Sequence, residues 1–205
     1  WEGDFTDGGT QALTGGTVHT FAPDHPFNTM LDVGLVVDLF WADPLGGSSN
    51  DFDLFVLDET GMTIKGSSVG AQNGTQDPFE EVFWDGFGGN YSDPAPGDQI
   101  VIVRLAGSSV RGLHVETFGF APLEIATSGA THGHNGGANT QSMAAVFWNS
   151  AHTGTKPFDG AHNPTEEFSS DGPRKIFFNP DGSAISPGNF LFSTNGGTTL
   201  EKPDF

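Results

Sequence analysis

"VGLVVDLFW" (residues 33–41) is the strongest indication of fold class in this chain. Successive side chains of an extended strand point to opposite faces of a sheet. One face of this stretch would therefore carry four apolar side chains: Leu35, Val37, Leu39 and Trp41. The alternation predicts a β-strand with one buried face.

Four further apolar runs of similar length follow this one along the chain. They are FDLFVLD (52–58), FEEVFW (79–84), QIVIVRL (99–105) and GLHVETFGF (112–120). Turns rich in Gly, Pro, Asn and Asp separate them, and no long amphipathic helix is visible among them. Short strands between such turns are typical of an antiparallel sandwich. We predict a mainly β protein with an antiparallel β-sandwich over residues 17–120, after a Gly-rich lead-in loop over residues 1–16.

The composition agrees with a β-rich fold. Of 205 residues, 30 are Gly, 13 are Pro and 19 are Phe, so turn formers and aromatic residues are abundant. A chain of this length can bury the core of one large domain or of two small ones. Cysteine is absent, which excludes disulfides, thiolate nucleophiles and Cys-ligated zinc.

The charge balance is strongly acidic. Seven Lys and Arg residues stand against 26 Asp and Glu residues, for a net charge of -19. Such a chain repels nucleic acid and anionic membranes, so we expect neither as a partner. No apolar run approaches the ~18 residues of a membrane span. Solubility in a secreted or salt-adapted protein explains most of the acidic residues, and one or two Ca²⁺ sites would explain the others.

The candidate metal ligands lie at the start of the run FDLFVLD. Asp51 and Asp53 are two residues apart, so both carboxylates point to the same side of a strand. Two such carboxylates repel each other unless water or a cation separates them. We predict a Ca²⁺ site from Asn50, Asp51 and Asp53, completed by Glu80 or Glu81 across the sheet. In the alternative interpretation, these acids simply face water at a strand end.

The histidines give no comparable pattern. The H-E-x-x-H motif of metalloproteases is absent. His132 and His134 are two residues apart in a Gly-rich loop. We interpret the pair as polar loop residues rather than as a transition-metal site.

Several motifs together resemble the subtilisin-like serine proteases. EEFSSDGPRK (166–175) is similar to the family's F-S-S-x-G-P motif, and EKPDF (201–205) is similar to its K-P-D-[VIL] motif. The stretch SGATHGHNGGANTQSMAAVFW (128–148) is similar to the segment that precedes F-S-S-x-G-P. NDFDLFVLDETG (50–61) and DPFEEVFW (77–84) resemble the jelly-roll P-domain or pre-peptidase-C-like module that many of these proteases carry.

The resemblance implies a fragment of a secreted, extracellular serine endopeptidase. Residues 17–120 would be an inserted jelly-roll-like β-sandwich, and residues 121–205 a β-rich segment of the α/β catalytic domain. The catalytic Asp, His and Ser and the oxyanion Asn would lie outside the chain, which alone would be inactive. Its partners would be the remainder of the catalytic domain and the protein or peptide substrate of the parent protease. Pro78 replaces an Asn of the module's pattern, so an inherited Ca²⁺ ligand is not expected there.

Ser142 begins the letters SMAA, which follow the nucleophile in this family. However, FSSDGP and KPDF precede the nucleophile in the family, whereas both follow Ser142 here. Thr140 and Gln141 replace the family's Gly-Thr, and Val146 replaces its Pro. Neither D-[ST]-G nor H-G-T-H is present to supply a base, without which a serine is a poor nucleophile. We therefore assign no catalytic residue.

The apolar residues after Ser142 are predicted to form a core strand instead. Ala144, Val146 and Trp148 would lie on its buried face.

A competing interpretation is a binding module without a protease parent. It would be a Ca²⁺-stabilised β-sandwich that binds carbohydrate or protein. Trp41, Trp84 and Trp148 could stack on sugars if they were exposed, but all three lie in apolar runs, which predicts that they pack in the core.

Overall fold

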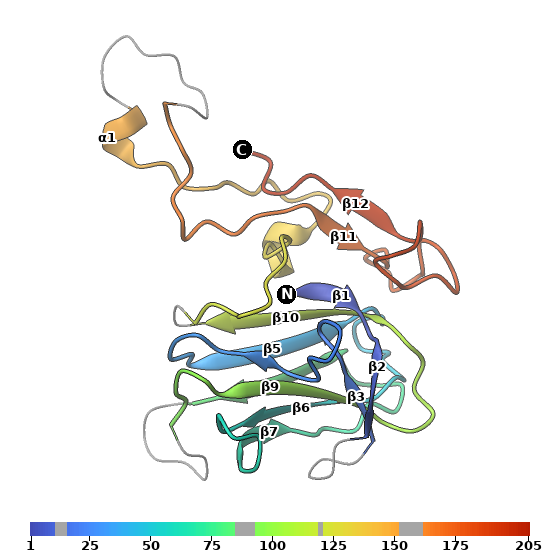
Figure 1. The fold of residues 1–205 in the computed structure, drawn as a ribbon. Coiled ribbons are helices and arrows are strands. Elements are labelled where there is room, and N and C mark those ends of the chain that lie inside the picture. Colours follow the sequence, from blue (N-terminus) through green and yellow to red (C-terminus); the bar gives the residue numbers. More distant parts are fainter. Residues whose placement is uncertain (11–15, 85–92, 119–120, 152–161) are drawn as a thin grey trace. The chain divides into compact units, whose positions relative to one another are not determined.

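The computed structural model describes residues 1–10, 16–84, 93–118, 121–151 and 162–205 (Figure 1). The chain forms two compact units. The first unit contains residues 1–127 and 177–197, and the second contains residues 128–176 and 198–205. None of the helices among the described residues is long and apolar enough to cross a membrane.

The first unit consists of two antiparallel sheets. The four-stranded sheet has the order β1 (Glu2–Asp4), β10 (Gly112–Phe118), β5 (Val36–Trp41), β8 (Phe79–Phe83). The six-stranded sheet has the order β2 (Asp7–Thr10), β3 (Thr17–His19), β9 (Gln99–Arg104), β6 (Phe52–Leu57), β7 (Ile64–Ser68), with β4 (Asn28–Thr29) also paired to β9. The prediction of a mainly β protein with antiparallel sheets is confirmed.

The two sheets share one hydrophobic core. Apolar side chains from both sheets are fully buried in it, among them Val37 and Leu39 from β5 and Leu54 from β6. Trp41 of β5 contacts Phe52 of β6, with ring centroids 5.3 Å apart. Full burial of one such side chain contributes about 1.5–3 kcal/mol relative to its exposure. The alternation in the sequence therefore specified the inner faces of the sheets.

Leu35 departs from the predicted buried face of residues 33–41. Strand β5 begins at Val36, and the Leu35 side chain is 51% exposed. The backbone at this position still pairs, because Leu35 N–H donates to Phe118 O at 2.8 Å. Leu35 therefore takes part in backbone pairing, but its side chain lies outside the buried core.

The boundaries of the sandwich differ from the prediction. Residues 1–16 were expected as a lead-in loop, yet they supply β1 and β2, and β1 pairs with β10 from Glu2↔His114 to Asp4↔Gly112. The edge of a sheet has backbone N–H and C=O groups without partners. A polar, Gly-rich segment can pair with these groups through its own backbone and is therefore stable there. Residues 11–15 of the expected loop and residues 119–120 of the last apolar run lie outside the described residues.

A distant segment, residues 177–197, also joins this unit. Gly112 N–H donates to Phe190 O at 2.8 Å, and the Asp4 carboxylate accepts a hydrogen bond from Ser193 N at 2.9 Å. A Cβ atom on Gly112 would lie 2.8 Å from the Phe192 ring, so only glycine permits this close approach. Residues 121–127 and 177–197 therefore belong with the sandwich rather than with the predicted 121–205 segment.

The second unit has little regular structure. It contains a two-stranded sheet of β11 (Arg174–Ile176) and β12 (Thr198–Leu200), the 3₁₀ helix η1 (Gly133–Gly136) and the short helix α1 (Trp148–Ala151). The predicted core strand after Ser142 is wrong. Val146 forms a single bridge with Thr165, and helix α1 begins two residues later. A strand needs a continuous partner, and the described residues supply only this one bridge.

The three tryptophans that were predicted to lie in a core divide between the units. Trp41 and Trp84 are buried in the sandwich core, as predicted, whereas Trp148 is 71% exposed. The prediction that Trp148 packs in a core is wrong, because its segment forms no buried strand.

His19 is a buried titratable group in the sandwich core. Its ring contacts Phe21, Trp1 and Phe5 at centroid distances of 4.6, 4.9 and 5.5 Å. Its Nδ1 accepts a hydrogen bond from Thr6 N at 3.1 Å, so the neutral ring carries its proton on Nε2. Burial among these rings lowers the pKa of His19 to about 4.

This burial predicts a loss of stability in acid. The unfolded chain binds a proton at His19 near pH 6.5, but the folded chain does so only near pH 4. The free energy of unfolding should therefore fall as the pH drops from about 6.5 to about 4, by about 3 kcal/mol from this group. Urea unfolding at pH 7 and pH 4 should show a smaller loss in His19→Gln than in the wild type. The exposed His25 provides the control, and equal losses in His19→Gln and His25→Gln would contradict the assignment.

Candidate functional site

Three of the four predicted metal ligands interact electrostatically within the sandwich unit. Asp53 lies on β6 of the six-stranded sheet, and Glu80 lies on β8 of the four-stranded sheet. Burial raises the pKa of Asp53 to about 6, and the neighbouring carboxylates of Asp51 and Glu80 act in the same direction. The charges of Asp51 and Glu80 thus both act unfavourably on ionised Asp53.

Gln72 connects these carboxylates, and the sequence did not predict it. Its Nε2 donates to Glu80 Oε1 at 2.6 Å. Burial raises the pKa of the Asp51 carboxyl group, and the backbone N–H of Gln72 acts in the opposite direction. Ser68 of β7 donates to the other oxygen of Glu80. Gln72 belongs to an irregular loop without periodicity, so only its neighbours in space identify it.

Two oxygens in this cluster have no hydrogen-bond donor among the described residues. They are Asp51 Oδ1 and Gln72 Oε1, both shielded from solvent. The Gln72 side chain as a whole is only 7% exposed. A buried polar atom without a partner costs about 1–3 kcal/mol, so such atoms need an explanation.

Asn50, the fourth predicted ligand, belongs to a different network. Its Nδ2 donates to both carboxylate oxygens of Asp43, at 2.9 and 2.8 Å, and its Oδ1 accepts from Ser109 N at 2.6 Å. Asp43 also accepts a hydrogen bond from Arg111 Nε at 2.7 Å. The structure therefore separates Asn50 from the other three residues and gives it a role in anchoring loops.

Ser142 lies in the second unit and is buried. Its N–H and its Oγ both donate to Asp204 Oδ2, at 2.8 and 3.1 Å. Lys202 Nζ donates to the same oxygen at 2.7 Å. The hydrogen bond from Lys202, followed by that from the Ser142 backbone, holds the pKa of Asp204 at about 2. A carboxylate of such low basicity is a poor general base, so this arrangement gives Ser142 a structural role.

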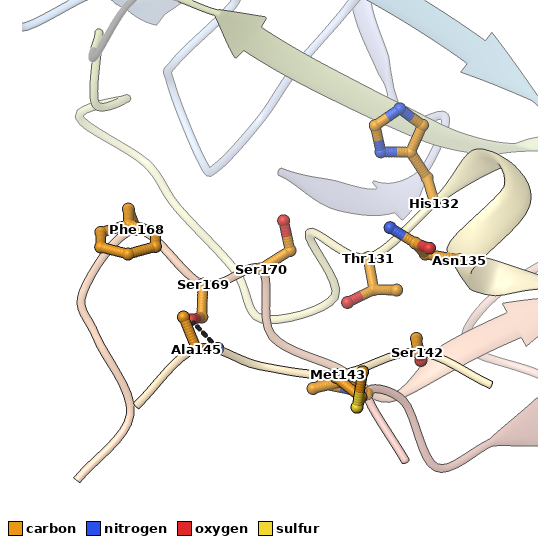
Figure 2. A pocket seen from close by; sticks show the side chains of 10 residues that line it. Thr131, His132, Asn135, Ser142, Met143, Ala145, Phe168, Ser169 and Ser170 are labelled. Carbon is orange, nitrogen blue, oxygen red and sulfur yellow. Dashed lines mark hydrogen bonds between the residues drawn. The ribbon is translucent and has the colours of Figure 1, made fainter. Parts of the chain in front are cut away.

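A pocket of about 260 Å³ lies beside Ser142 (Figure 2). Its lining contains hydroxyl and amide side chains but no carboxylate and no Lys or Arg. The lining residues are Thr131, His132, Asn135, Ser142, Met143, Ala145, Phe168, Ser169, Ser170 and Pro203. Figure 2 shows the His132 ring directed away from Ser142. Ser142 and His132 are therefore not arranged as a nucleophile and its base.

The FSSDGP motif (168–173) and the KPDF motif (202–205) pack against each other. The Cα of Gly172 faces the backbone of Lys202 so closely that a Cβ atom would lie 1.6 Å from Lys202 O. The Asp171 carboxylate accepts hydrogen bonds from Gly129 N and Ala130 N, both at 2.9 Å. The close approach of the Lys202 backbone explains why residue 172 of the FSSDGP motif must be glycine.

Asp53→Asn should stabilise the chain at neutral pH in the presence of EDTA. The unfolded carboxyl group titrates near pH 3.8, whereas the folded one titrates near pH 6. Ionised Asp53 therefore opposes folding increasingly as the pH rises through this window. Thermal unfolding should show a higher Tm for the variant at pH 7 and no gain at pH ~3.5. The control is Glu81→Gln, which neutralises an exposed acid on the same strand as Glu80; a gain of equal size in that control would contradict the prediction.

Gly172→Ala should disrupt the second unit selectively. The added methyl group collides with backbone, which cannot rotate away, so we expect a loss of about 3 kcal/mol or more in this unit. Limited proteolysis should then cleave within residues 128–176 while fragments of the sandwich survive. Gly136→Ala is the control, because its methyl group would meet the flexible Arg174 side chain at 3.3 Å and the Thr131 backbone oxygen at an ordinary contact distance of 3.7 Å. Identical digestion of both variants would contradict the role of Gly172.

Comparisons with protein-family models, with curated proteins and with solved structures find no match to this chain. The resemblance to subtilisin-like proteases therefore rests on the sequence motifs alone.

Proposed function

We propose that this chain is a non-catalytic portion of a secreted subtilisin-like serine endopeptidase. The jelly-roll-like sandwich would be an inserted P-domain or pre-peptidase-C-like module, and the second unit would be a segment of the catalytic domain. One observation carries the proposal. The two protease-like motifs, which are separated by 28 residues of sequence (174–201), pack against each other through Gly172 and Lys202.

The path of the chain links the two proposed parts a second time. The chain leaves the second unit after Ile176, contributes residues 177–197 to the sandwich unit, and returns at Thr198. Strands β11 and β12 flank this excursion and pair with each other, from Ile176↔Thr198 to Arg174↔Leu200. The two ends of this excursion lie close together, but the excursion is separate from the proposed module at residues 17–120.

The surface of the second unit supports a partner in the remainder of a catalytic domain. Five large apolar side chains in this small unit are half or more exposed: Met143, Phe147, Trp148, Phe168 and Phe205. Exposed apolar residues in such number are typical of surfaces that another protein segment covers. The sandwich would then stabilise the protease or bind its protein or peptide substrate.

A second candidate is a Ca²⁺-stabilised β-sandwich that binds carbohydrate or protein. The observation in its favour is that the sandwich unit completes its own core from both sheets. The flanking coding sequence discriminates the two candidates. A protease parent requires D-[ST]-G and H-G-T-H upstream and G-T-S-x-A-x-P downstream, whereas the binding module requires none of these motifs.

The purified chain should not hydrolyse peptides. Because Ser142 donates to a carboxylate of low basicity, it should not be activated as a nucleophile. Casein hydrolysis and labelling by a fluorophosphonate probe should both be absent, with an active subtilisin as the positive control. The proposal fails if the chain cleaves casein and Ser142→Ala abolishes that cleavage.

A further inference from the structure

We propose that Gln72 completes a Ca²⁺ site with the carboxylates of Asp51, Asp53 and Glu80, and that this site clamps the loop between β7 and β8 onto the edge of the sandwich. The amide oxygen of Gln72 would be the neutral ligand. The site belongs to the sandwich unit alone and does not depend on a protease parent.

The unpartnered oxygen atoms of Gln72 and Asp51 are suited to bind a cation. Gln72 is nine-tenths buried, its Nε2 is bound to Glu80 Oε1, and its Oε1 has no donor in the described part of the chain. Asp51 Oδ1 likewise has no hydrogen-bond donor in the described part of the chain. A bound cation would satisfy both oxygens, because a hard cation such as Ca²⁺ binds directly to oxygen atoms and no hydrogen-bond donor is needed.

The charge of the cluster points the same way. Burial raises the pKa of Asp53, the carboxylates of Asp51 and Glu80 act in the same direction, and the ion pairs found among the described residues include no Lys or Arg bound to these three acids. Two basic residues of the sandwich unit bind other acids: Lys65 binds Asp98 and Arg111 binds Asp43, at 2.8 and 2.7 Å. Uncompensated buried charge is costly, and a divalent cation would remove that cost.

The chemistry of the ligands favours Ca²⁺ over other divalent ions. All the ligand atoms are oxygens, without the imidazole or thiolate that zinc prefers. Ca²⁺ accepts six to eight oxygens in flexible geometry, so water would fill the remaining positions, whereas Mg²⁺ demands a near-ideal octahedron.

The present spacing predicts that binding moves the loop. Asp51, Asp53 and Glu80, all of them described residues, do not form a group in which one oxygen of each lies within 4.8 Å of the other two. Repulsion would hold them apart, and a shared cation would draw them together. Gln72 and Ser68 are already bonded to Glu80, so the loop would move with it. Gly70 keeps this space open, because a Cβ atom there would lie 3.1 Å from Glu80 Oε1.

Thermal unfolding and calorimetric titration of the full 205-residue chain test the proposal. CaCl₂ at about 100 times the Kd should raise the Tm by about 5–10 °C over EDTA. NaCl of equal ionic strength should give a smaller rise, since it only screens the net charge of -19. Titration should give one Ca²⁺ per chain. A Tm rise that NaCl reproduces in full, or no binding heat at pH ~7, would overturn the site.

Two variants separate coordination from a structural role. Asp53→Asn, expected to fold well, should raise the Tm in EDTA but weaken Ca²⁺ binding at least tenfold. In EDTA, Gln72→Glu should have a lower Tm than the wild type, because it places a fourth carboxylate beside Glu80. In CaCl₂, the same variant should have a higher Tm than the wild type. A lower Tm in both buffers would mean that Gln72 is only a structural residue. Glu81→Gln is the matched control and should bind Ca²⁺ with the affinity of the wild type. If Asp53→Asn also bound Ca²⁺ with wild-type affinity, the proposal would be overturned.

Discussion

The packing of the two inner sheet faces against each other organises the whole sandwich unit. Trp41 from one sheet lies against Phe52 from the other, within a core that both sheets fill with fully buried aliphatic side chains. Burial of apolar surface is the main favourable term in folding. It also fixes the register, since a shift of one residue would turn the apolar side of each strand outward.

The same packing creates the acidic edge of the sandwich. Asp53 and Glu80 belong to different sheets, and these sheets approach each other at the edge strands β7 and β8, where Ser68 donates to Glu80. The packing of the sheets thus imposes an unfavourable charge interaction on Asp53, which local sequence preferences would not produce. Natural proteins tolerate such unfavourable local arrangements mainly where a ligand or a function compensates them.

The second unit is stabilised differently. It has a single two-stranded sheet among its described residues and leaves large apolar side chains exposed, so polar contacts carry much of its organisation. Asp204 collects hydrogen bonds from Ser142 and Lys202, and Gly172 lies directly against the Lys202 backbone. A unit of this kind gains stability when a partner covers its apolar surface, which is consistent with a place inside a larger domain.

The strands of the sandwich could be predicted from the amino-acid sequence, because alternation and turn residues are local signals. The burial of Val37, Leu39 and Trp41 follows from their spacing alone, as does the proximity of Asp51 and Asp53. Three outcomes emerged only from the folded chain. Gln72 joins the acidic cluster, Asn50 binds Asp43 instead, and residues 143–151 form no strand. Each of them depends on which partners distant segments supply, and local sequence does not specify the geometry of those partners.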